Sequence, residues 1–276
     1  MKTFISKIVC LLILSTGVSF VNAQRPNVYD ADSAKSVVPY SPLREADVFW
    51  SKRIWRVIDM REKINLPFYY PTVAVDGLKS FMQVLLDALK DSSITAFEPG
   101  DDQFYIPFSV QQIYASLTDT EHVTLPQTEP PYNMVETTIV KKFDPTTVTK
   151  IRLKEDWFFD KQRSVMDVRI IGICPILEEY ESDGVTLKGS KPLFWVYFPQ
   201  ARNVFVKAKV FNRFNTVQRL TYDDLFFKRM FGSYIYKESN VYDRTIQEYA
   251  KGMDALLESD RIKNDIFLTE HDLWEY

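Results

Sequence analysis

Three carboxylates and a tryptophan lie close together in the stretch KEDWFFDKQR, which begins at residue 154. Glu155, Asp156 and Asp160 are the residue types that work in pairs to hydrolyse glycosidic bonds, and Trp157 could stack on a sugar ring. If a strand runs as far as Asp160, residues 156 and 160 lie on the same face of it. The spacing therefore admits a glycan hydrolase as one hypothesis.

Basic residues interleaved with these carboxylates argue against that chemistry. A catalytic acid that is neutral at neutral pH needs a raised pKa, and neighbouring cations oppose such a shift. We therefore interpret the stretch as a polar rim around an aromatic patch that binds another protein. A glycan hydrolase using Asp156 and Asp160 remains the alternative, as does a peptidoglycan-binding module. The candidate interface residues here are Trp157, Phe158, Asp160, Lys161 and Arg163.

A second segment, residues 229–249, has the same character. Charges of both signs alternate with phenylalanine and tyrosine, and arginine beside tyrosine is typical of the residues that dominate binding energy at protein interfaces. The other interpretation is that these aromatics pack a helix onto its own sheet, with exposed ion pairs that contribute little. The candidate interface residues here are Arg229, Tyr234, Tyr236, Lys237, Glu238 and Arg244.

No other pattern in the sequence indicates catalysis. The chain has two histidines and two cysteines, and no CxxC, HExxH or glycine-rich phosphate loop occurs. We therefore expect no catalytic, cofactor-binding or metal-binding residues. Cys174 precedes Pro175 at the end of an apolar run, which predicts a buried, unreactive thiol.

The first 23 residues read as a secretory signal peptide. Lys2 and Lys7 precede an apolar run too short for a membrane span, and Val21 and Ala23 occupy the positions that signal peptidase reads. Gln24 follows the expected cut, where lipid attachment would need cysteine. We expect an exported, soluble periplasmic protein, and its net charge of −3 offers no basic surface for nucleic acid.

After the signal peptide, residues 24–42 predict an extended, proline-containing arm that orders against a partner. Residues 43–276 predict a single α+β domain, with a long loop or an internal boundary near residues 118–133. Three- and four-residue spacings of apolar side chains predict helices, as do the capping-box pairs Ser109 with Gln112 and Thr221 with Asp224. The expected helices cover residues 43–65, 78–90, the segment after Ser109, the segment from 221 to about 238, and residues 245–263.

The middle of the chain predicts strands at residues 148–157, 165–180 and 193–198, because β-branched and aromatic residues alternate with polar ones between turn signals. Turns are expected at residues 160–162, 182–184 and 189–190. Residues 202–211 fit a helix and a strand equally well. The expected fold is α+β, with a central antiparallel β meander and N-terminal and C-terminal helices packed against it.

Three long segments resemble one protein family. They are WRVIDMREKINLPFYYP from Trp55, LKEDWFFDKQRSVMDVRIIGICP from Leu153, and LTYDDLFFKRMFGSYIYKESNVYDRTIQEY from Leu220. All three are similar to the GldN/PorN family of the type IX secretion and gliding-motility machinery of Bacteroidota. The resemblance implies a non-enzymatic periplasmic subunit beneath the outer membrane. It also implies self-association in a ring with a GldK/PorK-type lipoprotein, and contact with a GldM/PorM-type inner-membrane protein.

A ring built from head-to-tail contacts needs two different patches on each subunit. The family resemblance does not supply them. From the residues alone, we expect one patch in residues 157–163 and the other in residues 229–244.

Overall fold

A computed structural model describes residues 35–276 except 118, 127–133, 142, 181–185, 213–214, 216–218 and 275–276. Only the backbone is described for residues 119–126 and 134–141. The predicted signal peptide, the first part of the arm up to residue 34, and the predicted turn at residues 182–184 lie outside the described residues.

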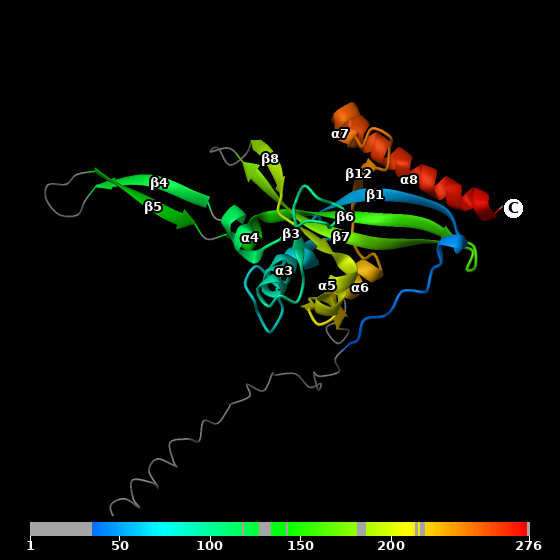
Figure 1. The fold of residues 1–276 in the computed structure, drawn as a ribbon, viewed down its shortest axis with the longest axis horizontal. Helices are drawn as coiled ribbons and strands as arrows, with labels where there is room; N and C mark the ends of the chain where they lie inside the picture. The colour runs from blue at the N-terminus through cyan, green and yellow to red at the C-terminus, as the bar shows by residue number, and fades with distance from the viewer. Residues whose placement is uncertain are drawn as a thin grey trace, which may run out of the picture. The chain divides into compact units, whose positions relative to one another are not determined.

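Among the described residues, eight strands form one antiparallel sheet in the order β12-β1-β6-β7-β9-β2-β3, with β8 also paired to β7 (Figure 1). Their bounds are β1 Val48–Asp59, β2 Ala96–Phe97, β3 Pro107–Phe108, β6 Val148–Asp160, β7 Val165–Tyr180, β8 Leu187–Pro192, β9 Trp195–Tyr197 and β12 Tyr234–Glu238. Two further pairs are β4 Asp119–Pro126 with β5 Met134–Lys141, and β10 Lys209–Val210 with β11 Leu220–Thr221.

The helices come from both halves of the chain. They are α2 Leu66–Tyr69, α3 Phe81–Lys90, α4 Val110–Leu117, α5 Phe198–Phe205, α6 Tyr222–Phe227, α7 Ile246–Tyr249 and α8 Met253–Trp274, with 3₁₀ turns at Glu45–Asp47 and Pro145–Thr147. The α+β fold class, with a central antiparallel sheet and helices towards both ends, is confirmed.

The predicted helix over residues 43–65 is wrong, because its central part is strand β1. Residues 54–58 of that strand are all buried, so apolar side chains occur on both faces and the alternation that marks a strand is lost. The apolar residues of this segment happen to recur at intervals of three and four positions, which is the pattern of a helix, and this coincidence produced the wrong prediction. The β-branched and aromatic content of VFWSKRIWRVID was the better signal.

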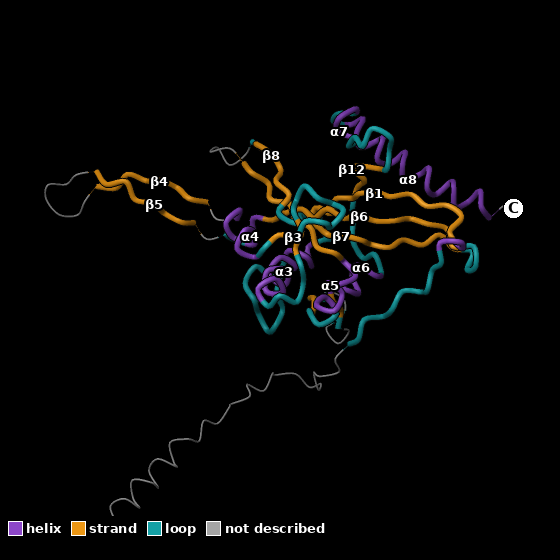
Figure 2. The backbone as a smooth tube through the Cα atoms, in the orientation of Figure 1, coloured by secondary structure: helices purple, strands orange, loops and turns teal. Residues whose placement is uncertain are grey.

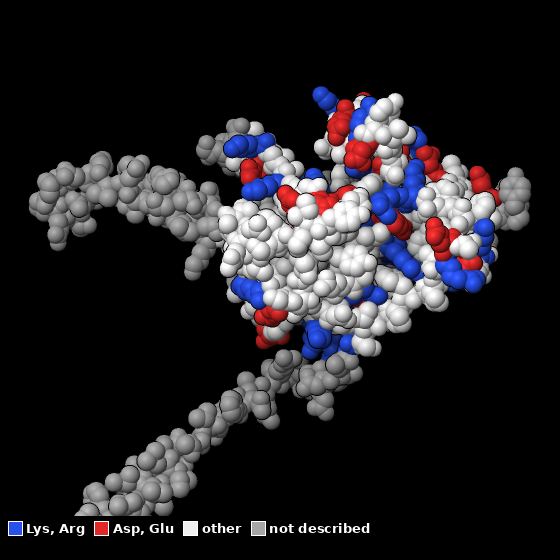
Figure 3. Space-filling view, viewed as in Figure 1, with Lys and Arg blue, Asp and Glu red and all other residues white. Residues whose placement is uncertain are grey.

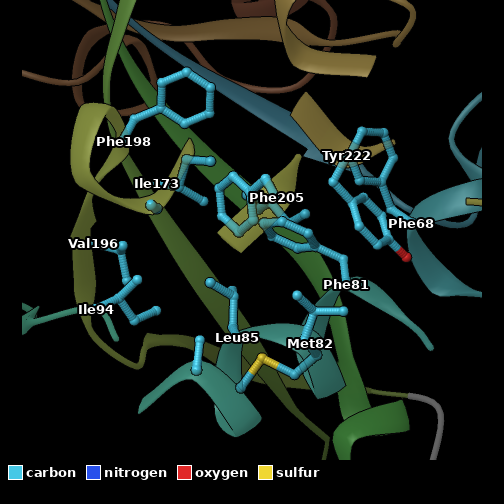
Figure 4. Packing of buried hydrophobic residues seen from close by; sticks show 14 of the residues in the cluster. Phe68, Phe81, Met82, Leu85, Ile94, Ile173, Val196, Phe198, Phe205 and Tyr222 are labelled. Atoms are coloured by element: carbon cyan, nitrogen blue, oxygen red, sulfur yellow. The ribbon is translucent and has the colours of Figure 1, made fainter. Parts of the chain in front are cut away.

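The main core lies between the sheet and the helices α3, α5 and α6. Aromatic rings meet there in a network, with Phe81 5.3 Å from Tyr222 and from Phe205 between ring centroids (Figure 4). Helix α3 ends at Lys90 as predicted but begins three residues after the predicted start, after a capping box in which Ser80 accepts from the backbone of Gln83. Much of the aromatic content of the chain therefore serves its own core.

The opposite face of the sheet has a smaller cluster. Trp55, Cys174 and Trp195 are buried there, under a loop that places Asp102 and Phe104 over them. Trp55 donates to the Asp102 carboxylate from its Nε1 atom at 3.0 Å. The predicted burial of Cys174 is confirmed, and burial raises the pKa of its thiol to about 12.

The hairpin of β6 and β7 is the centre of the sheet and was predicted closely. Strand β7 has the predicted bounds, β6 continues three residues past its predicted end, and Gln162 donates to Asp160 in the turn between them. The predicted turn at residues 189–190 is wrong, because both residues belong to β8. The ambiguous residues 202–211 hold the end of α5 and then the short strand β10, so both readings apply to part of the segment.

Two predictions about loops and arms also change. Residues 119–126 form β4 and pair with β5, where a long loop was expected. Residues 35–42 contain no helix or strand, and they lie against the chain's own body. Lys35 donates to the Arg219 carbonyl oxygen at 2.6 Å, and Ser41 accepts from Arg169 at 2.5 Å. This part of the arm therefore packs against its own chain.

The C-terminal third is less helical than predicted. The capping box of Thr221 and Asp224 starts α6 as expected, but that helix ends at residue 227 and residues 234–238 form the edge strand β12. Arg229 has a φ of 52°, which a continuing helix does not allow. The predicted helix over residues 245–263 is divided into α7 and α8 at Gly252, whose φ is 59°.

Helix α8 packs on the sheet beside β12 (Figures 1 and 2). Its core-facing residues are Ser259, Ile262 and Ile266, and the Ser259 hydroxyl accepts from the backbone of Ile235 at 2.9 Å. The predicted core face was Ile246, Tyr249, Met253, Leu256 and Leu257. Only Ile246 of that set is buried, so the prediction of this face is wrong. Over the described residues, no helix is long and apolar enough to span a membrane.

Candidate interaction surface

The candidate residues of the first segment divide into a buried group and an exposed group. Phe158 and Asp160 are buried in β6, and the guanidinium of Arg169 lies 5.3 Å from the centre of the Phe158 ring. Lys161 and Arg163 are exposed in the turn that follows. Charges of both signs gather at this end of the hairpin (Figure 3). The turn, rather than the strand, thus provides the accessible surface.

Trp157 is partly buried and belongs to a charged cluster around the buried Glu155. Its indole Nε1 donates to the Glu155 carboxylate at 3.1 Å, and Arg229 donates to both oxygens of the same carboxylate at 2.9 and 3.2 Å. The guanidinium lies 5.3 Å from the centre of the Trp157 ring and 5.2 Å from that of Phe231. The Glu155 side chain is completely buried. Arg229 therefore joins the second candidate segment to the first.

The candidate residues of β12 are also paired across the sheet. Lys237 forms an ion pair with Asp243 at 2.6 Å and lies 4.5 Å from the centre of the Trp55 ring. Glu238 forms an ion pair with Lys52 of β1 at 2.6 Å. These charges fasten the edge strand to its neighbour and leave little of either side chain for a partner.

The tyrosines of β12 are half-buried. The pKa values of Tyr234 and Tyr236 are raised because burial disfavours their ionised forms. The guanidinium of Arg152 lies 5.0 Å from the centre of the Tyr236 ring. Arg244, in contrast, is exposed and lies 4.4 Å from the centre of the exposed Tyr242 ring.

Reasoning from the sequence missed the residues of the arm that meet the hairpin. Tyr40 stacks on Phe227 at 5.8 Å, and the guanidinium of Arg202 lies 4.5 Å from the centre of the Tyr40 ring. Arg163 donates to the Ser41 hydroxyl. A shallow hollow of about 300 Å³ forms where the arm crosses the hairpin. The only feature of the arm's sequence that could have indicated this contact was a single tyrosine, Tyr40, among small and polar residues.

Two exposed patches remain near the candidate segments. The first, called the hairpin patch, consists of Phe49, Lys161, Arg163 and Val165. The second, called the loop patch, consists of Val241, Tyr242, Arg244 and Tyr249. Each combines exposed apolar or aromatic side chains with at least one cation, and Val241 is 97% exposed. Such a composition suits contact with another protein.

The carboxylates of the first segment are engaged by groups of their own chain. Both Asp156 oxygens accept from Arg53, at 2.6 and 2.8 Å. The Asp160 carboxylate is buried and accepts from the backbone of Gln162 at 2.9 Å. Glu155 points to the other face and is bound by Arg229.

No cluster of three or more histidine, cysteine, aspartate or glutamate side chains that could hold a metal ion occurs within the described residues.

The structure defines an α+β protein with a large antiparallel sheet, in which many of the candidate charged residues are paired within the chain. The family model for the gliding motility associated protein GldN matches residues 43–275. The chain therefore belongs to the GldN family, which is associated with gliding motility and type IX secretion. No curated protein matches the sequence.

Proposed function

We propose that the chain is a non-enzymatic, periplasmic structural subunit of the type IX secretion machinery. In this proposal it forms a large ring with a GldK/PorK-type lipoprotein beneath the outer membrane. It also contacts a GldM/PorM-type protein of the inner membrane. The observation that carries the proposal is the family match, which extends over residues 43–275.

The structure supports the proposed role in assembly because some charged side chains are paired within the chain while other side chains remain exposed. Paired charges such as Arg229 with Glu155 bind the loop before β12 to the sheet, while the hairpin patch and the loop patch are left accessible. We propose that these two patches make the head-to-tail contacts of the ring, since such contacts need two different surfaces on one subunit. The buried candidates Phe158 and Asp160 then support the hairpin patch from beneath.

The experiment is gentle extraction of cell envelopes, followed by size separation and identification of the proteins that travel with this chain. The expected result is a very large complex that contains a lipoprotein. Recovery of the chain only as a free monomer would refute the ring.

The patches are tested by charge reversal at exposed positions. Lys161→Glu in the hairpin patch is expected to reduce the amount of large complex while the melting temperature stays within about 2 °C, because an exposed substitution changes stability little. Lys188→Glu, at an exposed lysine of β8, is the matched control and is expected to assemble normally. Equal assembly by both variants would exclude the hairpin patch from the ring contact.

A further inference from the structure

Helix α8 has apolar side chains on two opposite faces. One face, with Ile262 and Ile266, is buried against the sheet. The other carries five large apolar side chains that are between 54% and 70% exposed: Met253, Leu256, Leu257, Phe267 and Leu268. A helix that covers one sheet needs a single apolar face. The second face is therefore unexplained by the fold of this chain.

The exposed face has the spacing of a coiled-coil seam. Its central residues are Met253, Leu257, Asp260, Asn264, Phe267 and His271, with successive spacings of four, three, four, three and four. Alternation of three and four is the pattern that keeps a seam facing a second helix. Met253, Leu257 and Phe267 make the seam apolar on both sides of its centre, the centre is the polar pair Asp260 and Asn264, and the seam ends at His271.

The order of side chains along this seam is self-complementary when it is read in reverse. If a second α8 lies antiparallel and the two cross at the level of residue 262, Leu257 faces Phe267 of the other copy. In the same alignment Met253 faces His271, and Asp260 faces Asn264. The Asn264 amide can then donate to the Asp260 carboxylate twice, once on each side of the two-fold axis.

A parallel pair would be much less favourable. Each residue would then face its own copy, so two Asp260 carboxylates would meet at the centre of the seam, and like charges there repel. Antiparallel helices also align their dipoles favourably. Arg261 flanks the seam but is neutralised within its own chain by Glu258 at 2.6 Å and Asp265 at 2.7 Å. The charge of Arg261 beside the seam therefore does not oppose the antiparallel arrangement.

We infer that α8 is a self-association surface, through which two copies of this chain pair antiparallel about a two-fold axis at residue 262. Covering five large apolar side chains on each copy buries on the order of 1,000 Å², which is below the roughly 1,200–2,000 Å² of stable specific interfaces and in the range of weak, transient ones. The pair is consequently weak in isolation. An isologous contact of this kind stops at two copies, so it is distinct from the head-to-tail contact proposed for the ring.

Cross-linking tests both the contact and its direction. Met253→Cys and His271→Cys are prepared as separate variants of the chain without residues 1–23, each treated with a short bis-maleimide alone and then as an equimolar mixture. Positions 253 and 271 are 18 residues apart, which is about 27 Å along a helix. An antiparallel pair brings 253 of one copy beside 271 of the other. The native Cys174 is buried and does not interfere.

The expected result is a covalent dimer in the mixture and none with either variant alone. Dimers from the single variants would show parallel pairing and overturn the inference. Absence of dimer in the mixture at hundreds of micromolar protein would also overturn it. Sedimentation gives an independent measurement: Leu257→Glu, at an exposed position, is expected to stay monomeric where the unmodified chain associates. Identical sedimentation of the two proteins would refute the contact even if the large envelope complex is intact.

Discussion

Arg229 offers the clearest distinction between a residue that holds the fold and one that binds a partner. Its guanidinium donates two hydrogen bonds to a fully buried Glu155 carboxylate and lies against two aromatic rings. Replacement by methionine keeps most of the apolar length but leaves the carboxylate without its cation. We therefore predict that Arg229→Met destabilises the chain itself, before any partner is involved.

The magnitude follows from burial. Breaking a buried ion pair by removing one partner costs about 3–5 kcal/mol. The Arg229 side chain is 28% exposed, so we take the lower end, about 3 kcal/mol. For a domain of this size, 1 kcal/mol shifts the melting temperature by about 2–4 °C, which gives a fall of about 6–12 °C.

The assay is thermal and urea unfolding of the chain without residues 1–23, with circular dichroism as the signal that monitors unfolding. Arg244→Met is the matched control: that arginine stacks on exposed Tyr242, and its replacement is expected to cost less than about 1 kcal/mol. In a double-mutant cycle with Glu155→Leu, the two losses should be non-additive by about 2 kcal/mol. If Arg229→Met unfolds like the unmodified chain but abolishes the large envelope complex, Arg229 is an interface residue and our reasoning is wrong.

Three further predictions follow from the arm and the buried thiol. Although burial alone would raise the pKa of Asp224, hydrogen bonds from Lys35 and the helix cap lower it to about 2. The stability this carboxylate adds is present above its unfolded pKa near 4 and is lost as pH falls towards 2, so acid unfolding of Lys35→Met should depend less on pH in that window. Tyr40→Ala removes the stack on Phe227 and should release the arm, which limited proteolysis at residues 35–42 would detect as faster cleavage. An unchanged cleavage rate would show that this stack does not hold the arm. Cys174 should react with a thiol reagent only in denaturant, and rapid reaction of the native chain would contradict its burial.

The parts of the fold that could be predicted from the sequence are those whose signals are local. The structure has the predicted caps at Ser109 and Thr221, the predicted turn at Asp160 and the predicted bounds of β7, and each of these depends on neighbouring residues. Strand β1 could not be predicted by periodicity, because covering both faces of the sheet removes the period. Its burial is a property of distant segments, α3 and the loop at Phe104 among them.

The candidate surface shows the same limit for function. The composition of residues 157–163 and 229–244 indicated two segments in which charged and aromatic side chains occur together. It did not reveal that Arg229 reaches Glu155, or that Lys237 lies over Trp55, since these partners are 74 and 182 positions away in the chain. Pairing across the sheet decides which charges are left for a partner. The sequence shows which types of residue are present, but it does not show which of them pair within the chain and which remain accessible to a partner.

The internal pairing has a consequence for how the proposed ring gains its strength. Ion pairs within the subunit engage four of the candidate residues, namely Glu155, Arg229, Lys237 and Glu238. The hairpin patch and the loop patch that remain are small surfaces. Each ring contact proposed for them is therefore weak by itself. In a closed ring every subunit repeats both contacts, and each bond formed raises the effective concentration for the next. A weakened patch is also repeated at every position. Small losses per contact should therefore appear as a steep loss of assembly, with the folded subunit unchanged.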